Sequence, residues 1–369
     1  MTNAADPAPV EPGIDGGKVE LPHPAETPVL VSVIIPAYNA ANSISAALDS
    51  VFAQTFSDFE VLVINDGSPD TEALEQVLQP YMGRIVYLKQ SNKGPGAARN
   101  AGIVRMRGKY AAFLDSDDVW LPTHLATQVR ILTEDPTLDL VYADSILMED
   151  GTAVGHAFGR EPQLDSVTFE ALLAETCNVG TSSAVVSRES LTAAGMFDER
   201  FRCCEDFDLW LRMSFRGARM KYDPAVHLYH TLSRGSLSGN RHVMKRARIE
   251  VYGKAASKLP VSEQQRSLIR GLVDKTEAAC QVDLLKDFLH TRQYDRALAT
   301  ARRASRVQNN WKLRFTIIGL RTAPVIVRHY HRLHEHILSL RSRIRRRNSV
   351  RKLSSAQPVV VAGKGNKSL

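Results

Sequence analysis

The feature of this 369-residue chain that most restricts its fold is an alternation of apolar runs with helix-like segments between residues 29 and 115. The runs VLVSVIIPAY (29–38) and FEVLVIND (59–66) are rich in β-branched residues, which suits strands buried on both faces. Segments with helical spacing follow them, and further strands are expected at 84–90 and 109–115. Strands that alternate with helices predict an α/β fold with a mainly parallel central sheet and right-handed crossovers.

Beyond residue 120 the alternation is less regular, with strands expected at 138–144 and 181–187. Residues 281–304 indicate two antiparallel helices that turn at 290–293, similar to a single tetratricopeptide-type hairpin without a second copy. The organisation we expect is a disordered arm (1–28), an α/β domain (29–240), an α-helical C-terminal region (241–347) and a disordered basic tail (348–369).

The first 28 residues are rich in Pro, Gly and acidic residues and offer little to bury, and they lack the apolar run of a signal peptide. No uncharged apolar stretch reaches the roughly 18 to 20 residues that cross a bilayer. The four cysteines show no C-x-x-C spacing. We therefore expect a reduced, cytosolic chain without a zinc site.

Charge divides the chain into two unlike parts. Residues 1–240 hold 18 Lys and Arg against 32 Asp and Glu, whereas residues 241–369 hold 29 against 8. The two parts are therefore expected to have different partners. A basic C-terminal part is consistent with an anionic membrane surface or with nucleic acid.

Polar clusters lie where three of the expected strands end. They are PAYN (36–39), NDGS (65–68) and DSDD (115–118). In an open parallel sheet, ligands bind at the carboxyl ends of the strands, so these clusters are expected to lie at one functional edge.

The DSDD cluster directly follows the apolar run YAAFL. Carboxylates at alternating positions project to the same side and can hold a hard divalent ion that also takes oxygens from a diphosphate. A solvated turn or helix cap is the alternative interpretation of three acidic residues. The position after a buried strand favours metal binding, with Mn²⁺ or Mg²⁺ as the expected cofactor.

Five motifs in order, VSVIIPAYN, VLVINDGS, NKGPGAARNAGI, FLDSDD and CCEDFDLWLR, resemble the signature of the family 2 glycosyltransferases over about residues 30–240. The resemblance implies a GT-A type nucleotide-diphospho-sugar transferase fold. It also implies an inverting enzyme that transfers a sugar from a nucleotide diphosphate sugar, with a UDP-sugar as the default donor, to an acceptor hydroxyl. The expected setting is cell-surface polysaccharide, glycolipid or glycan synthesis, with a glycan or lipid-linked acceptor.

The resemblance also assigns roles to the residues that would bind the nucleotide. Asp66 matches the carboxylate that pairs with the base ring of the donor; the alternative is a turn cap for Gly67 and Ser68. Residues that match the loop lining the nucleotide pocket are Pro36, Tyr38 and Asn39.

Arg99, in GPGAARN, matches a donor-binding position, with a surface cation on an amphipathic helix as the alternative. Asp115 and Asp117 match the first and last carboxylates of the family's D-x-D motif. The resemblance makes Asp117 the direct metal ligand and gives Asp115, beside Ser116, a contact with ribose or with the metal. Asp118 is the weaker candidate.

Asp206, in CCEDFDLW, matches the catalytic base of inverting members. A carboxylate there could take the proton of the acceptor hydroxyl as that oxygen attacks the anomeric carbon. Glu205 is expected to cap the helix, and Asp208 to pair with Arg212 four residues later.

The chain departs from the family pattern after the base, where many members carry a histidine near the diphosphate or metal. Aligning the serines places Ser233 at that position. Three explanations remain open: His230 or His227 substitutes from a shifted register, Arg234 supplies the charge, or the third metal-side ligand is missing.

Two other functions compete with sugar transfer as interpretations of the sequence. A sugar nucleotidyltransferase is disfavoured because its early Gly-rich loop is replaced by PAYNA. A catalytically inactive sugar-binding or scaffolding module is disfavoured because Asp117 and Asp206 are both present.

The segment 328–352 is expected to form a basic amphipathic helix, with an apolar stripe that includes Ile337, Leu338 and Leu340. Our hypothesis is peripheral attachment to the inner face of the membrane. Nucleic acid is the less favoured partner, because aromatic residues are not interleaved with the charges.

Overall fold

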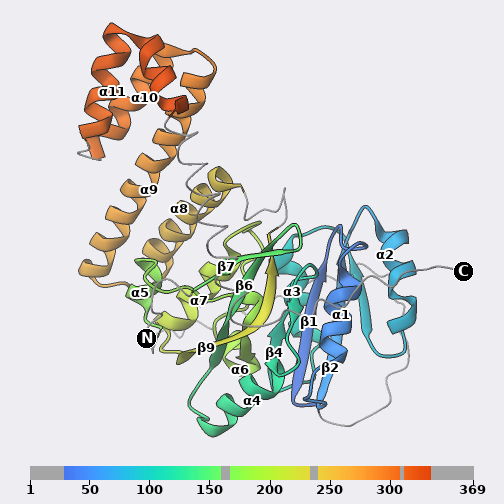
Figure 1. Ribbon diagram of the computed structural model, residues 1–369. Coiled ribbons are helices and arrows are strands. Elements are labelled where there is room, and N and C mark those ends of the chain that lie inside the picture. The colour runs from blue at the N-terminus through green and yellow to red at the C-terminus, as the bar shows by residue number, and fades with distance from the viewer. Residues whose placement is uncertain (1–28, 159–166, 233–239, 308–310, 334–369) are drawn as a thin grey trace, which may run out of the picture.

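The computed structural model describes residues 29–158, 167–232, 240–307 and 311–333. Its strands are β1 (Val31–Ala37), β2 (Phe59–Asp66), β3 (Val86–Gln90), β4 (Tyr110–Phe113), β5 (Val119–Trp120), β6 (Leu140–Glu149), β7 (Thr152–His156), β8 (Val185–Ser187) and β9 (Met220–Thr231). In these ranges they form one sheet in the order β3-β2-β1-β4-β8-β6-β9-β5, with β7 paired to β6 (Figure 1).

The strands β3, β2, β1 and β4 pair in parallel, which confirms the expected α/β fold. The rest of the sheet is mixed, because β8 runs antiparallel to both β4 and β6, whereas β9 runs parallel to β6. The parallel half contains the strand ends on which the candidate site depends.

The helices of the sheet region are α1 (Ile44–Phe52), α2 (Thr71–Leu78), α3 (Pro95–Arg105), α4 (His124–Glu134), α5 (Phe169–Leu173), α6 (Arg188–Ala193) and α7 (Glu205–Phe215). Two short 3₁₀ turns are η1 (Gln79–Tyr81) and η2 (Thr181–Ser183). Figure 1 shows these helices around the sheet.

Two hydrophobic cores lie on opposite faces of the sheet. Because side chains alternate along a strand, Val33 and Ile35 of β1 join the core under α1, α2 and α4. Ile34, between them, joins the core under α3, α5 and α7. Burial on both faces explains why β1 is a continuous apolar run.

The C-terminal helices are α8 (Arg241–Lys258), α9 (Glu263–His290), α10 (Tyr294–Val307) and α11 (Trp311–Thr322). Val251 and Tyr252 of α8 and Ile269 of α9 belong to a core of the sheet region. Leu285 and Leu289, near the other end of α9, belong to a separate core with α10 and α11. The 28-residue helix α9 therefore connects two cores, and Figure 1 shows it carrying α10 and α11 away from the sheet.

The helical hairpin predicted for 281–304 agrees with the structure, since α9 ends at His290 and α10 begins at Tyr294. The domain limits that we expect at 240 and 347 stay predictions. The arm 1–28 and the stripe at 337–340 lie outside the described residues. The four cysteines are free thiols. Among the helices in the described ranges, none is both long and apolar enough to span a bilayer.

Candidate functional site

The loops that follow β1 and β2 are tied together by backbone-to-side-chain hydrogen bonds. The N–H of Asn39 donates to Oγ of Ser68 at 2.7 Å, and the N–H of Ala41 donates to Oδ2 of Asp70 at 2.9 Å. Ser68 also donates to Asp70. Tyr38, at the tip of the first loop, is 49% exposed. The first loop is thus held in shape while its aromatic ring stays open to solvent.

Asp66, the last residue of β2, is buried and accepts three hydrogen bonds. The donors are the side-chain amide of Gln90 and the backbone N–H groups of Lys93 and Gly94, at 2.8 to 2.9 Å. The N–H of Ser68 is bonded by Asn65, not by Asp66. Asp66 therefore anchors the start of α3. The alternative role for Asp66, a cap of the turn at Gly67 and Ser68, is filled by Asn65.

Arg99 projects from α3 between two acidic side chains from other elements. Its Nη1 donates to Oε1 of Glu205 at 2.7 Å, and its Nη2 donates to Oδ1 of Asp115 at 2.6 Å. Arg99 is 5% exposed, so the alternative of a surface cation is wrong. Burial opposes its charge, but the two carboxylates outweigh that effect and raise the pKa of Arg99 above its ordinary value.

The two carboxylates beside Arg99 respond differently. Burial raises the pKa of Glu205 above its usual range; Arg99 opposes this shift and the nearby Asp206 charge adds to it. Burial also acts to raise the pKa of Asp115, but Arg99 more than offsets it and the pKa of Asp115 is lowered. Glu205 begins α7 and is an ion-pair partner of Arg99.

Asp206 is held by the 3₁₀ turn η2. Oγ1 of Thr181 donates to Oδ2 of Asp206 at 2.9 Å, and the N–H of Phe207 donates to Oδ1 at 2.7 Å. The next residue, Ser182, accepts from the N–H of Asp115 at 3.1 Å. One short turn therefore contacts both the DSDD segment and Asp206. Sequence reasoning missed Thr181 and Ser182, although they lie in the TSS segment that begins the run leading to Asp206.

Asp118 is fully buried and tethers the end of β9. Its Oδ2 lies 3.0 Å from Nδ1 of His230, and its Oδ1 accepts from the N–H of Thr231 at 2.9 Å. This contact forms because β5, directly after DSDD, pairs antiparallel with β9, with Val119 opposite Tyr229. Asp118 thus has a structural role, and it brings His230 to the acidic turn.

His230 lies in a negative environment. Burial lowers the tendency of its ring to carry charge, but the hydrogen bond and charge of Asp118, with the charges of Asp115 and Asp117, raise the pKa of His230 to about 9. Because Asp118 engages Nδ1, Nε2 is the ring nitrogen suited to a metal ion. In the part of the chain that the structure describes, no three His, Cys, Asp or Glu side chains form a group that could hold a metal.

His227, the other candidate histidine, lies elsewhere. Its Nε2 is 3.0 Å from Oδ2 of Asp223, and its ring centroid is 5.8 Å from that of the buried His124. Arg234 lies outside the described residues. Of the two histidines considered for the missing position, the structure therefore brings His230 to the DSDD turn.

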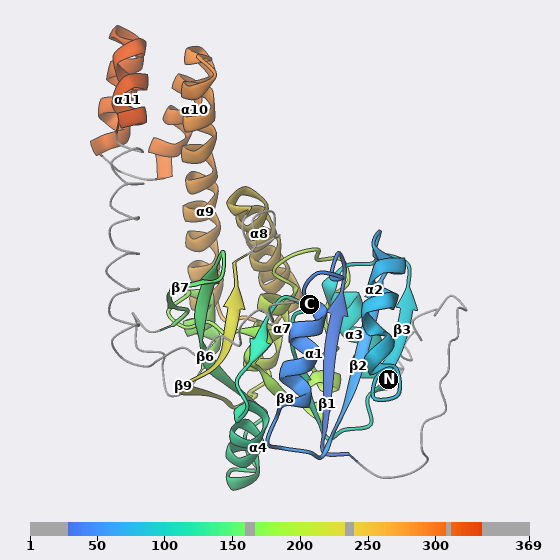
Figure 2. The same cartoon turned by 45° about the vertical axis from the view of Figure 1, so that its right-hand side comes forward.

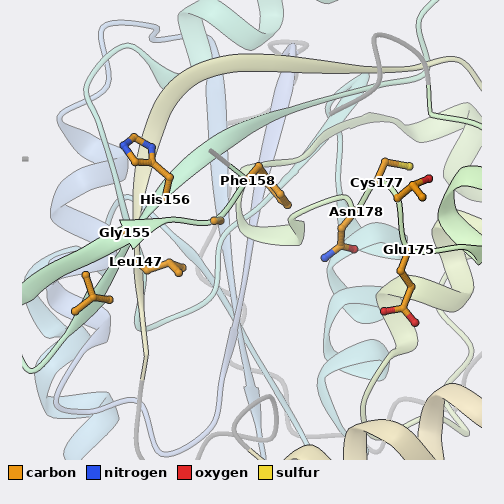
Figure 3. Close-up of a pocket in the computed structure, with 10 residues that line it drawn as sticks. Leu147, Gly155, His156, Phe158, Glu175, Cys177 and Asn178 are labelled. Carbon is orange, nitrogen blue, oxygen red and sulfur yellow. The ribbon is translucent and has the colours of Figure 1, made fainter. Parts of the chain in front are cut away.

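A cavity of about 450 Å³ opens beside this region (Figure 3). It is lined by His156 and Phe158 from the β7 end and by Glu175, Cys177 and Asn178 from the loop before η2. A Cβ at Gly180 would lie 3.5 Å from Cζ of Phe158, so the wall of the cavity lies close to the residue that precedes Thr181. The cavity is therefore adjacent to the turn that holds Asp206.

The candidate residues form one connected arrangement at the carboxyl ends of the strands. Asp66 holds the start of α3, α3 carries Arg99, and Arg99 joins Asp115 to the first turn of α7, which contains Asp206. Pro36 is the next-to-last residue of β1, so the loop predicted for it begins two residues later, whereas Asn39 and Ser116 lie in the segments after β1 and β4 at the same edge.

A family model described as Glycosyl transferase family 2 matches residues 32–189. Five Rickettsia proteins described as uncharacterized glycosyltransferases are 31% to 34% identical over 50% to 53% of this chain. The match covers 29% to 62% of their own length, so the chain spans less than two thirds of these relatives. The Escherichia coli protein named UDP-Glc:alpha-D-GlcNAc-diphosphoundecaprenol beta-1,3-glucosyltransferase WfgD is 34% identical over 49% of this chain and 68% of its own length.

Two solved structures resemble the fold. S. aureus TarS 1–349 in complex with UDP-GlcNAc is 17% identical, with a TM-score of 0.58 over 83% of this chain and 92% of that chain. Mannosyltransferase PcManGT from Pyrobaculum calidifontis, in complex with GDP-Man and Mn²⁺, is 18% identical, with a TM-score of 0.51 over 82% of this chain and 86% of that chain. These likenesses confirm the expected fold class.

Proposed function

Because this chain belongs to glycosyltransferase family 2, we propose that it transfers a sugar from a nucleotide diphosphate sugar to an acceptor hydroxyl with inversion at the anomeric carbon. The observation that carries the proposal is the buried network that joins Asp115, Arg99 and Glu205 and ends beside Asp206. It links the proposed donor side of the site to the proposed base.

The donor nucleotide is proposed to lie across the loops after β1 and β2. A carboxylate offers about four acceptor positions, and three on Asp66 are occupied, which leaves one for the imide N–H of a pyrimidine or guanine base. The exposed ring of Tyr38 is available to stack on that base. WfgD is named for a UDP-Glc donor, which supports a UDP-sugar here.

The diphosphate is proposed to bind Mn²⁺ or Mg²⁺ together with Asp117, Asp115 and His230. Magnesium is usually held by one or two carboxylates plus substrate phosphates, so a preformed group of three protein ligands is not required. Asp118 orients the ring of His230 as second-sphere carboxylates do. When bound, the ion offsets the charge of the leaving diphosphate.

Asp206 is the proposed general base. Thr181 and the N–H of Phe207 fix its carboxylate, and a fixed carboxylate can accept the proton of the attacking hydroxyl. Glu205 is less suited to this role, because it is buried and its oxygen is already bonded to Arg99.

The acceptor is proposed to enter through the cavity lined by His156, Phe158 and Asn178, since its wall lies close to Gly180, which precedes the turn that holds Asp206. WfgD is named for an acceptor linked to diphosphoundecaprenol, which supports a lipid-linked acceptor in the synthesis of a surface glycan.

Two variants test the mechanism. Asp206→Asn is expected to keep donor affinity but lose transfer by at least about a hundredfold, because base catalysis contributes roughly 10²- to 10⁴-fold. Asp117→Ala is expected to lose manganese-dependent donor affinity. Glu134→Gln, at an exposed position on α4, is the matched control and should change neither property.

Isothermal titration with UDP-, GDP- and dTDP-sugars, followed by metal-dependent hydrolysis of each donor, supplies both readouts. Transfer retained by Asp206→Asn would place the base elsewhere. A wild-type chain that binds a donor but turns over none, with or without metal, would favour the inactive sugar-binding module.

A further inference from the structure

Helix α11 has two apolar faces, and one of them faces away from the protein. Leu313 and Leu320 are buried in the core shared with α9 and α10. On the other side Trp311, Phe315 and Ile318 are 64%, 66% and 57% exposed. Their spacing of four and three residues places them on one stripe of the helix.

Residues 324–333 continue as a second helix with the same pattern. Val327 packs against Gly319 of α11, where an added Cβ would come within 2.5 Å of Val327 Cγ2. Ile326, Tyr330 and Leu333 lie on the exposed side, again at spacings of four and three. Two adjacent helices thus present apolar stripes to solvent.

Such exposure is concentrated in this part of the described chain. Of the eleven large hydrophobic residues that are exposed there, eight lie between Val307 and Leu333. Large exposed apolar surfaces mark sites of protein or membrane interaction.

The charge of the segment selects between these partners. Residues 296–333 contain nine Lys and Arg and no Asp or Glu. A second copy of the chain would bring an equally basic surface against it, and nucleic acid would leave the aliphatic members of the stripes, Ile318, Ile326 and Leu333, exposed. An anionic lipid surface can attract the Lys and Arg side chains and also bury the apolar ones. Trp and Tyr, which occur in both stripes taken together, are enriched at membrane interfaces.

We propose that the exposed stripes of α11 and 324–333, with the cations around them, bind an anionic membrane surface. The stripes lie at the end of α9, and Figure 2 shows β1 and β3 pointing toward the end of the molecule where α10 and α11 lie. Binding at this tip turns the carboxyl ends of the parallel strands toward the membrane. This surface is distinct from the stripe at 337–340.

Co-sedimentation of the full chain with vesicles tests the proposal, using phosphatidylcholine alone or mixed with phosphatidylglycerol. The wild-type chain is expected to bind the anionic vesicles only, with affinity that falls as salt rises. The triple variant Trp311→Ser, Phe315→Ser, Ile318→Ser should bind at least about tenfold more weakly. Burial of even one large apolar side chain raises an association constant by about tenfold or more. These side chains are exposed, so the variant should keep the circular dichroism spectrum and melting temperature of the wild type.

Neutralising charge is the second arm. The variant Lys312→Ala, Arg314→Ala should bind about thirtyfold more weakly, at about 1 kcal/mol for each cation near the surface. The matched controls are Val104→Ser, an exposed apolar residue of α3, and Arg130→Ala, an exposed cation of α4. Neither should change vesicle binding.

Equal vesicle binding by the wild type and the triple variant would overturn the proposal. So would self-association of the wild type in sedimentation velocity that the triple variant loses, since a second copy would then be the partner. Tighter binding to duplex DNA than to anionic vesicles at equal salt would also exclude lipid as the partner.

Discussion

Replacing Arg99 with methionine should reveal how strongly its buried network supports the fold. The change removes two charge-assisted hydrogen bonds, at 2.7 Å to Glu205 and 2.6 Å to Asp115. The Glu205 side chain is only 8% exposed, so its unpaired carboxylate is costly, whereas Asp115 is 34% exposed and is screened by water. Breaking a buried pair costs about 3 to 5 kcal/mol, and we expect about 3 kcal/mol at pH 8.

The loss should depend on pH in a defined direction. The pKa of Glu205 is already raised in the folded protein, and removal of Arg99 takes away an interaction that lowers it. A carboxyl with a raised folded pKa destabilises the fold as pH rises from the unfolded value through the folded one. The loss of unfolding free energy in the variant should therefore be smallest below about pH 4, where the Glu205 carboxyl is protonated in both the folded and the unfolded protein.

Urea denaturation of both proteins at several pH values measures this difference. The double variant Arg99→Met, Glu205→Gln carries no buried charge at this position and should recover about 2 kcal/mol at pH 8. Arg130→Met, which breaks an exposed pair with Glu134, is the control and should cost less than about 1 kcal/mol. A loss that is independent of pH and is not recovered in the double variant would refute the reasoning.

Three further predictions follow from single contacts. Thr181→Val should lower turnover by about tenfold or more while leaving donor affinity unchanged, because the hydrogen bond that fixes the Asp206 carboxylate is lost; unchanged turnover would argue against Asp206 as the base. Gly102→Ala should cost about 1 to 3 kcal/mol in urea denaturation, since its Cβ would lie 2.6 Å from Cγ2 of Ile34; a neutral change would mean that β1 and α3 can separate without cost. Leu289→Ala should cost about 2 to 5 kcal/mol in the small helical core alone, so amide exchange should rise in α10 and α11 and stay unchanged in β1.

The parallel half of the site was predictable because it depends on local patterns. Asp66 and Asp115 follow continuous apolar runs, and parallel strands place such residues at one edge whatever the order of the strands. The sequence therefore indicates which side chains lie together there without any knowledge of long-range pairing.

The other half depends on contacts that no local pattern encodes. His230 reaches Asp118 across 112 positions, through the antiparallel pairing of β5 with β9. Thr181 was not predicted because η2 interrupts the strand expected at 181–187 and turns its hydroxyl to Asp206. The role of Arg99 was uncertain for the same reason, since both its partners come from other elements.

Helix α9 fixes the orientation of the basic C-terminal helices α10 and α11 relative to the proposed catalytic edge. Ile269 of α9 packs in a core of the sheet region. Leu285, sixteen residues further along the same helix, packs in the core shared with α10 and α11. Each residue of an α-helix advances about 1.5 Å and turns about 100°. A single alanine inserted between these two residues would lengthen α9 by only about 1.5 Å, but it would rotate the apolar stripes about the helix axis by about 100°. Seven inserted alanines would nearly restore the original orientation of the stripes and would move α10 and α11 about 10 Å further along the helix axis. The orientation of the stripes at a bilayer and their distance from the sheet could therefore be varied separately in the same chain.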